Sequence, residues 1–214
     1  MSEPLHIETF TLGDWMTNCY VLYNASGSCW LVDVGFEPEP MFAFIERRDL
    51  TPRQVVLTHA HVDHIAGLSE LSLRWPALPL LIHEAERDFP GDPMLNLSIV
   101  LASPVVAPAP SGTFAHGDVL KLDGIDFEVR HTPGHSPGGV CLYAPEHAVA
   151  LVGDTLFAGS IGRHDFPTSD GATLMRSIAD QLLTLPDTTR VLPGHGPETS
   201  VGRERATNPY LRGM

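Results

Sequence analysis

The segment Thr58–His64, THAHVDH, contains four side chains of the kinds that bind metal ions. In an extended backbone His59, His61 and Asp63 project to one side, while His64 points elsewhere unless the chain turns into a following helix. Four ligands that reach more than one point in space favour two adjacent metal ions. The segment follows the apolar residues Val55–Leu57, so we expect it at the end of a buried strand.

Three further candidate ligands also follow predicted strands and have glycine neighbours. They are His135 in HTPGHSPGG, Asp154 in LVGDTLF and His195 in VLPGHGP. Glycine allows the backbone to bring a side chain close to a ligand without a clash at Cβ. A lone loop histidine is usually solvated or satisfied in a core, and an aspartate after glycine usually forms a turn. The joint pattern of these residues with THAHVDH predicts a metal centre.

The elements that must position these residues are short. Segments bounded by Gly, Asn, Asp or Pro predict strands over Leu5–Leu12, Asn18–Asn24, Cys29–Val34, Val55–Thr58, Leu80–His83, Asp118–Leu122, Ile125–His131, Gly139–Tyr143, Ala148–Gly153 and Arg190–Leu192. Helical spacing of apolar residues predicts helices over Glu39–Asp49, Ile65–Trp75 and Asp170–Thr184. The sequence KLDGID at Lys121–Asp126 predicts a tight hairpin, because Asp-Gly suits positive φ angles.

The order of these elements, strands followed by helix twice over, predicts an α+β fold. Two β-sheets packed face to face, with helices on the outer faces, would bury so many short apolar strands. A proline-rich stretch, Ser103–Gly112, separates the two runs. We therefore expect a single domain over residues 1–214, built from two pseudo-halves joined near 103–112.

Charge and composition exclude several classes of protein. The chain has 26 acidic and 13 basic side chains and a formal net charge of -13, which argues against nucleic acid and anionic lipid as partners. No apolar run approaches the ~20 residues of a membrane span, and the N-terminus lacks the features of a secretory signal. The cysteines, Cys19, Cys29 and Cys141, have no CxxC spacing and predict buried free thiols. We expect a cytoplasmic protein that acts on a small molecule; the oligomeric state stays open.

The motifs THAHVDH, TPGHSPGG, GDTLF and GHGP together resemble the metallo-β-lactamase superfamily. The resemblance implies an αββα sandwich of two mixed β-sheets with metal ions at the sheet edge. It covers nearly the whole chain, since Met16–Tyr23 is similar to the opening hairpin of that family and Glu204–Leu211 to the end of its short bacterial members. Gly153–Pro167, GDTLFAGSIGRHDFP, resembles the glyoxalase II and persulfide dioxygenase branch.

The resemblance also implies the ligand set. One metal ion would be held by His59, His61 and His135, a second by Asp63, His64 and His195, and Asp154 would bridge both. Imidazole and carboxylate donors without thiolate suit zinc, which we expect, and also iron or manganese.

Two divalent ions about 3.5–4 Å apart can activate a shared water as hydroxide and polarise a carbonyl group. Asp63 is the ligand that we expect to orient this nucleophile. A thioester suits such a site, because thiolate leaves without a strong general acid. The predicted function is therefore a glyoxalase-II-like hydrolysis of a thioester such as S-lactoylglutathione.

The substrate-binding prediction concerns the loop GSIGRHDFP. The resemblance implies that Arg163 contacts the glutathione moiety and that His164 and Phe166 line the same loop. A structural ion pair between Arg163 and Asp165 is the alternative.

Two other functions stay open at this point. A persulfide dioxygenase would hold one iron with His59, His135 and Asp154. A non-enzymatic metal-binding protein would use the same ligands without turnover.

Overall fold

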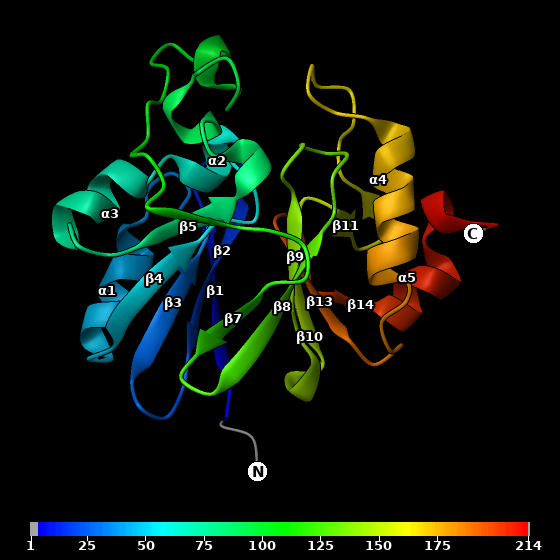
Figure 1. Cartoon of the computed structure of the whole chain (residues 1–214), viewed down its shortest axis with the longest axis horizontal. Coiled ribbons are helices and arrows are strands. Elements are labelled where there is room, and N and C mark those ends of the chain that lie inside the picture. The colour runs from blue at the N-terminus through cyan, green and yellow to red at the C-terminus, as the bar shows by residue number, and fades with distance from the viewer. Residues whose placement is uncertain (1–3, 214) are drawn as a thin grey trace. The chain divides into compact units, whose positions relative to one another are not determined.

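The structure is a computed structural model in which residues 4–213 are described, and it contains two compact units. The first unit comprises the chain up to Phe114 together with Lys121–Ile125, and the second comprises Ala115–Leu120 and the chain from Asp126 onward. Each unit is built around one six-stranded mixed sheet (Figure 1). The predicted class, two mixed β-sheets with helices, is confirmed. The single domain joined near 103–112 stays a prediction.

The first sheet has the strand order β1-β2-β3-β4-β5-β6. Its first two pairings are antiparallel and the other three are parallel. Its strands are β1 (His6–Leu12), β2 (Thr17–Tyr23), β3 (Ser28–Val32), β4 (Thr51–Val56), β5 (Leu80–His83) and β6 (Gly112–Phe114). The predicted strands of this half are confirmed within a few residues, and β6 is an addition that begins where the proline-rich stretch ends.

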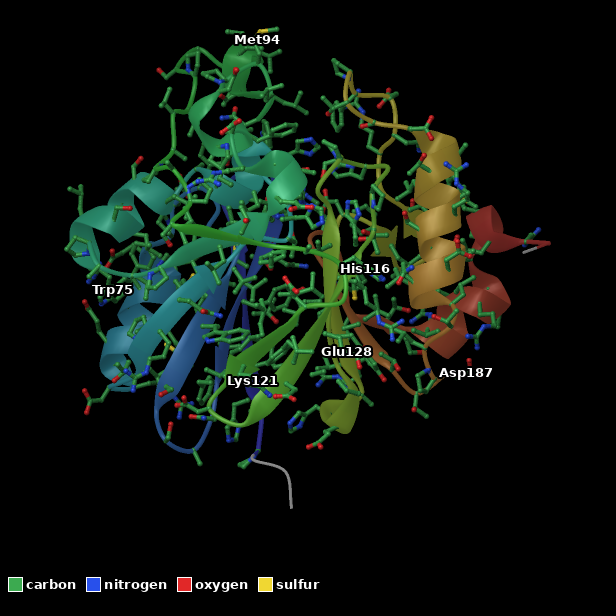
Figure 2. All side chains as sticks on the ribbon, viewed as in Figure 1. Trp75, Met94, His116, Lys121, Glu128 and Asp187 are labelled. Carbon is green, nitrogen blue, oxygen red and sulfur yellow. The ribbon has the colours of Figure 1, made fainter. Side chains whose placement is uncertain are left out.

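Helices α1 (Glu39–Arg47) and α3 (Leu68–Arg74) pack against this sheet, and the short helix α2 (Val62–Ile65) precedes α3. Buried side chains of α1 and α3, including Phe42 and Leu68, share one core with the strand residues Val21, Leu31 and Val55 and with Leu57, which follows β4. Trp75, labelled in Figure 2, directly follows α3, and its ring meets the Phe42 ring edge-on at 5.2 Å between centroids. The predicted helix Ile65–Trp75 is in fact two helices, because the Gly67 amide bonds to the Val34 carbonyl instead of to its own helix.

The second sheet has the order β14-β13-β10-β9-β8-β7. Its central strand β10 pairs in parallel with β13 and antiparallel with β9. Its strands are β7 (Val119–Leu122), β8 (Ile125–His131), β9 (Val140–Ala144), β10 (Val149–Gly153), β13 (Arg190–Pro193) and β14 (Thr199–Ser200). The predicted KLDGID hairpin joins β7 to β8, and Asp123 and Gly124 at its tip have φ angles of 43° and 93°. The Asp-Gly turn prediction is therefore confirmed.

Two helices cover one face of the second sheet. Helix α4 (Gly171–Ser177) continues as a wider π-helical turn through Leu182, and it places Leu174, Ile178 and Leu182 in a core with β9 and β10. Helix α5 (Val201–Thr207) adds Val201 to the same core. Helix α5 was not predicted from the sequence, and neither were three strands of two residues each: β14, and β11 (Leu156–Phe157) and β12 (Ser160–Ile161), which form a small hairpin.

Single helical turns connect several of these elements. They are η1 (Glu84–Glu86), η2 (Phe89–Gly91), η3 (Ser98–Val100), η4 (Pro145–His147) and η6 (Pro209–Leu211). Within residues 4–213, no helix is long and apolar enough to span a bilayer.

The three cysteines are buried and form no disulfide. Burial raises the pKa of the Cys29 and Cys141 thiols to about 12, and it raises the pKa of Cys19 as well. Because thiolate is the nucleophile, we expect the native protein to react slowly with an aromatic disulfide reagent at pH 8. Unfolding in guanidinium should make all three thiols reactive together. The absorbance of the aromatic thiolate released from the reagent measures this reaction. Fast reaction of any thiol in the native protein would contradict this expectation.

Candidate metal centre

The THAHVDH segment forms the turn between β4 and α2. His59 and His61 precede the helix, whereas Asp63 and His64 lie within its single turn, and all four side chains are buried. The His59 ring lies 4.7 Å from the His61 ring and 4.1 Å from the His64 ring, between centroids. His64 Nε2 lies 3.5 Å from Asp63 Oδ2. The structure thus brings the four predicted ligands of the first unit together.

Asp33 fixes both ends of this turn. Its carboxylate accepts hydrogen bonds from the Thr58 amide at 2.8 Å and the Thr58 hydroxyl at 2.7 Å. It also accepts one from His64 Nδ1 at 2.8 Å. Because Nδ1 carries the proton, His64 presents the lone pair of Nε2 on the side of Asp63, the tautomer that a metal ligand requires.

Further buried contacts hold the middle of the turn. The Ala60 amide, between His59 and His61, donates to Glu86 Oε2 at 2.6 Å, and the Val62 amide donates to the Asn96 carbonyl at 2.9 Å. Thr17 Oγ1 donates to Asp63 Oδ2 at 2.9 Å. These contacts restrict the ligands before any ion binds.

Asp33, Thr17 and Glu86 were not predicted from the sequence to belong to the site. Asp33 could have been recognised as a candidate site residue, because it follows the buried strand β3 within LVDVG, much as Asp154 follows β10 within LVGDT. Thr17 and Glu86 had no comparable signal.

The other three predicted ligands lie together in the second unit. Asp154 follows β10 and His195 follows β13, and since these strands are parallel, both residues leave the same edge of the sheet. His135 lies in the turn after β8. Asp154 Oδ2 is 3.6 Å from His135 Nε2 and 3.4 Å from His195 Nε2. One carboxylate oxygen therefore faces two imidazoles.

The loop that follows β12 encloses this second group. His135 Nδ1 donates to the Arg163 carbonyl at 2.7 Å, which directs His135 Nε2 toward Asp154. Gly162 lies so close to Asp154 that a Cβ there would be 1.8 Å from the Asp154 carbonyl oxygen. Only glycine allows this approach.

The spacing of the ligand atoms in each unit fits a metal ion. Two donors that each lie about 2.0–2.1 Å from one tetrahedral zinc ion are about 3.4 Å apart. The separation of Asp63 from His64, and those of Asp154 from His135 and His195, fall between 3.4 and 3.6 Å. Such distances are long for direct hydrogen bonds and suit shared coordination.

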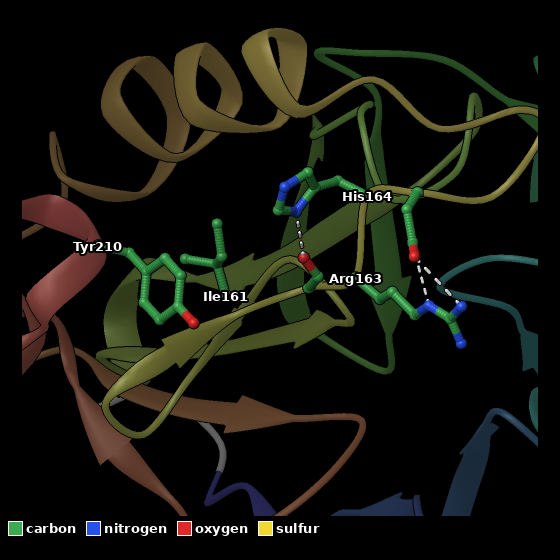
Figure 3. Close-up of a pocket in the computed structure, with 6 residues that line it drawn as sticks. Ile161, Arg163, His164 and Tyr210 are labelled. Carbon is green, nitrogen blue, oxygen red and sulfur yellow. Dashed lines mark hydrogen bonds and ion pairs between the residues drawn. The ribbon is translucent and has the colours of Figure 1, made fainter.

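In the predicted substrate loop Arg163 forms the ion pair with Asp165, and its contact with the substrate stays a prediction. The guanidinium pairs with Asp165 and lies 4.4 Å from the centroid of the Phe166 ring. Asp165 holds the pKa of Arg163 above its usual value, and Arg163 lowers that of Asp165. The Phe166 ring in turn meets His135 edge-on at 5.8 Å. Arg163 and His164 line a hollow of about 300 Å³ on the protein surface (Figure 3). Phe166 lies under the Arg163 guanidinium and does not line this hollow.

Residues 12–195 match the sequence family described as the metallo-β-lactamase superfamily. The chain belongs to this superfamily. Among its curated relatives is YqgX of Bacillus subtilis, named as a probable metallo-hydrolase, which is 39% identical over 95% of this chain and 96% of its own. The hydroxyacylglutathione hydrolase GloC of Haemophilus influenzae is 34% identical over 97% of this chain and 98% of its own.

Solved structures of this superfamily show the same fold. The B3 metallo-β-lactamase BLEG-1 superposes with a TM-score of 0.93 at 38% identity, over 97% of this chain and 100% of its own. TTHA1623, solved in a di-iron-bound form, gives a TM-score of 0.85 at 38% identity, over 95% of this chain and 100% of its own. Membership of this metallo-hydrolase superfamily, with the His and Asp groups of both units, supports hydrolase activity and the use of divalent metal ions.

Proposed function

We propose that this member of the superfamily is a thioester hydrolase that uses two metal ions. The observation that carries the proposal is the position of Asp154, whose Oδ2 lies 3.4 and 3.6 Å from two imidazole nitrogens at the end of a rigid buried strand. The relative GloC, named as a hydroxyacylglutathione hydrolase, makes S-lactoylglutathione the first substrate to test.

The proposed ligand assignment follows the superfamily pattern. His59, His61 and His135 would hold one ion, Asp63, His64 and His195 the other, and Asp154 would contact both. The spacing within each unit supports this assignment. When bound, two divalent ions supply an activated water and a Lewis acid for the carbonyl oxygen of the substrate. We propose zinc, and TTHA1623 in its di-iron form makes iron the alternative.

The side chains of the protein would orient the reacting groups. Thr17 fixes Asp63 through Oδ2, and we assign to Asp63 Oδ1 the hydrogen bond that directs the attacking water. Asp33 keeps His64 in the tautomer that binds metal, and the Arg163 carbonyl does the same for His135. A thiolate leaving group needs no proton from the protein, which suits a site without an assigned general acid.

Metal analysis combined with an assay tests the proposal. We expect two ions per purified chain and hydrolysis of S-lactoylglutathione ahead of lactones and β-lactams. Removal of the ions with dipicolinate should abolish the activity, and added zinc should restore it. One iron per chain with oxygen uptake on glutathione persulfide would instead favour the dioxygenase alternative, and metal binding without turnover of any thioester would contradict an enzymatic role.

A further inference from the structure

The C-terminal turn of the chain forms one wall of the hollow beside Arg163. The hollow is lined by Ile161, Gly162, Arg163, His164, Asp165 and Tyr210. In Figure 3 Tyr210 projects from the turn η6 beside Ile161 of β12, and Arg163 and His164 extend from the following loop. Tyr210 is 53% exposed, although its neighbour Leu211 is buried. The turn thus presents a half-exposed aromatic ring to this hollow.

A single buried amide connects the two walls. Asn208 Nδ2 donates to the Ser160 carbonyl of β12 at 2.9 Å, and Asn208 Oδ1 accepts from the Tyr210 amide at 3.0 Å. Asn208 itself is 1% exposed, and both of its contacts are partly buried. The Asn208 side chain, together with the core that contains both Leu211 and Ile161, therefore sets the position of Tyr210 relative to the loop of Arg163.

The carboxylate of Glu204 holds the Asn208 side-chain amide in place. Its Oε2 accepts from Asn208 Nδ2 and from the Gly159 amide, at 2.9 and 2.8 Å, and its Oε1 accepts from the Thr199 hydroxyl. Glu204 is fully buried, and burying a carboxylate is costly unless it organises several donors. Gly159 is in the β11–β12 hairpin and Thr199 is in β14, so this carboxylate joins the hairpin to the C-terminal helix.

We propose that Tyr210 is a substrate-binding residue that packs against the thiol carrier of the thioester, and that Asn208 and Glu204 are its positioning residues. The inference rests on the proposed thioesterase function and names the part of the substrate that this hollow takes. The loop of the hollow also supplies the carbonyl that orients His135, so it lies directly beside the ligands of the second unit.

The charges of the lining residues define the class of carrier. Arg163 is the only Lys or Arg among them, and it is already paired with Asp165. His164 donates from Nδ1 to the Gly162 carbonyl at 3.3 Å, and Tyr210 adds a neutral phenol. The hollow therefore has no surplus positive charge. It suits a polar, peptide-like carrier, and it does not suit a polyphosphate carrier such as coenzyme A.

Substrate truncation tests this assignment in the metal-loaded full chain. For Tyr210→Ala we expect about a tenfold rise of KM for S-lactoylglutathione with little change of kcat, because an aromatic contact is lost. The same variant should hydrolyse the lactoyl thioester of 2-mercaptoethanol, which lacks the peptide, with the KM and kcat of the original protein. Tyr210→Phe should retain the original KM, and Asn208→Ala should behave like Tyr210→Ala. Leu73→Ala, at another exposed apolar side chain, is the control.

An unchanged KM in Tyr210→Ala, or an equal loss with both thioesters, would overturn the inference. If the original protein hydrolyses neither thioester, the proposed function fails, and binding of S-methylglutathione by calorimetry then decides the inference separately. A Kd about tenfold weaker in Tyr210→Ala would support it. An equal Kd, no binding to the original protein, or tighter binding of coenzyme A would refute it.

Discussion

Replacement of Asp154 with alanine is expected to lower kcat/KM for the best thioester substrate by about a thousandfold, the scale of several kcal/mol of lost metal-assisted stabilisation. The physical reason is that Asp154 Oδ2 faces both His135 and His195. One substitution therefore removes the metal-binding oxygen that lies between these two proposed ligands. Metal content per chain should fall in parallel. Steady-state kinetics and elemental analysis on the same preparation measure both effects.

Two comparisons make this prediction specific. Glu146→Ala, at an exposed carboxylate just before the same strand, should keep full activity and metal content. Asp154→Asn should retain the fold but hold metal weakly, because an amide oxygen is a poorer donor than a carboxylate. Full metal content and activity in Asp154→Ala would refute the bridging role.

The second large effect is expected at Asp33, although this residue is not in the proposed ligand set. Asp33→Ala removes the acceptor for His64 Nδ1 and for both Thr58 donors. Loss of such an outer partner typically weakens metal binding by about 10- to 100-fold. Leaving buried donors unsatisfied should also lower the free energy of unfolding by roughly 3 kcal/mol. Competition with a fluorescent chelator and denaturant unfolding of the metal-free protein measure the two quantities.

Asp49→Ala provides a matched control for Asp33→Ala. Both aspartates have left-handed backbones, with φ angles of 59° and 52°, but Asp49 is exposed at the end of α1. The two substitutions therefore introduce similar backbone strain, and only Asp33→Ala removes the contacts to Thr58 and His64. Equal losses in the two variants would assign the effect to the backbone and would contradict the role of Asp33.

The parts of the site that sequence alone predicted are those with local signals. THAHVDH follows an apolar strand, and Asp154 and His195 follow β10 and β13, so residue type and position at a strand end were both visible. The long strands, α1 and the KLDGID hairpin were predictable for the same reason: each has a repeating pattern or a turn residue within its own few residues.

The supporting contacts could not be predicted, because they join distant parts of the chain. Thr17 and Asp63 are 46 residues apart, Ala60 and Glu86 are 26 apart, and Ser160 and Asn208 are 48 apart. None of these partners stands out by type or spacing. The hairpin of β11 and β12 was equally hidden, since strands of two residues have no period to detect.

The contacts of Asn208 bear on how this chain could diverge in evolution. Asp154 and His195 are placed by the backbone ladder of β10 and β13, whereas Tyr210 is placed through side chains, those of Asn208 and of the buried Leu211. Substitutions in the C-terminal turn can therefore alter one wall of the hollow while the ladder keeps its register. Descendants of this protein could acquire new substrate preferences there by few mutational steps, with their reaction chemistry inherited intact.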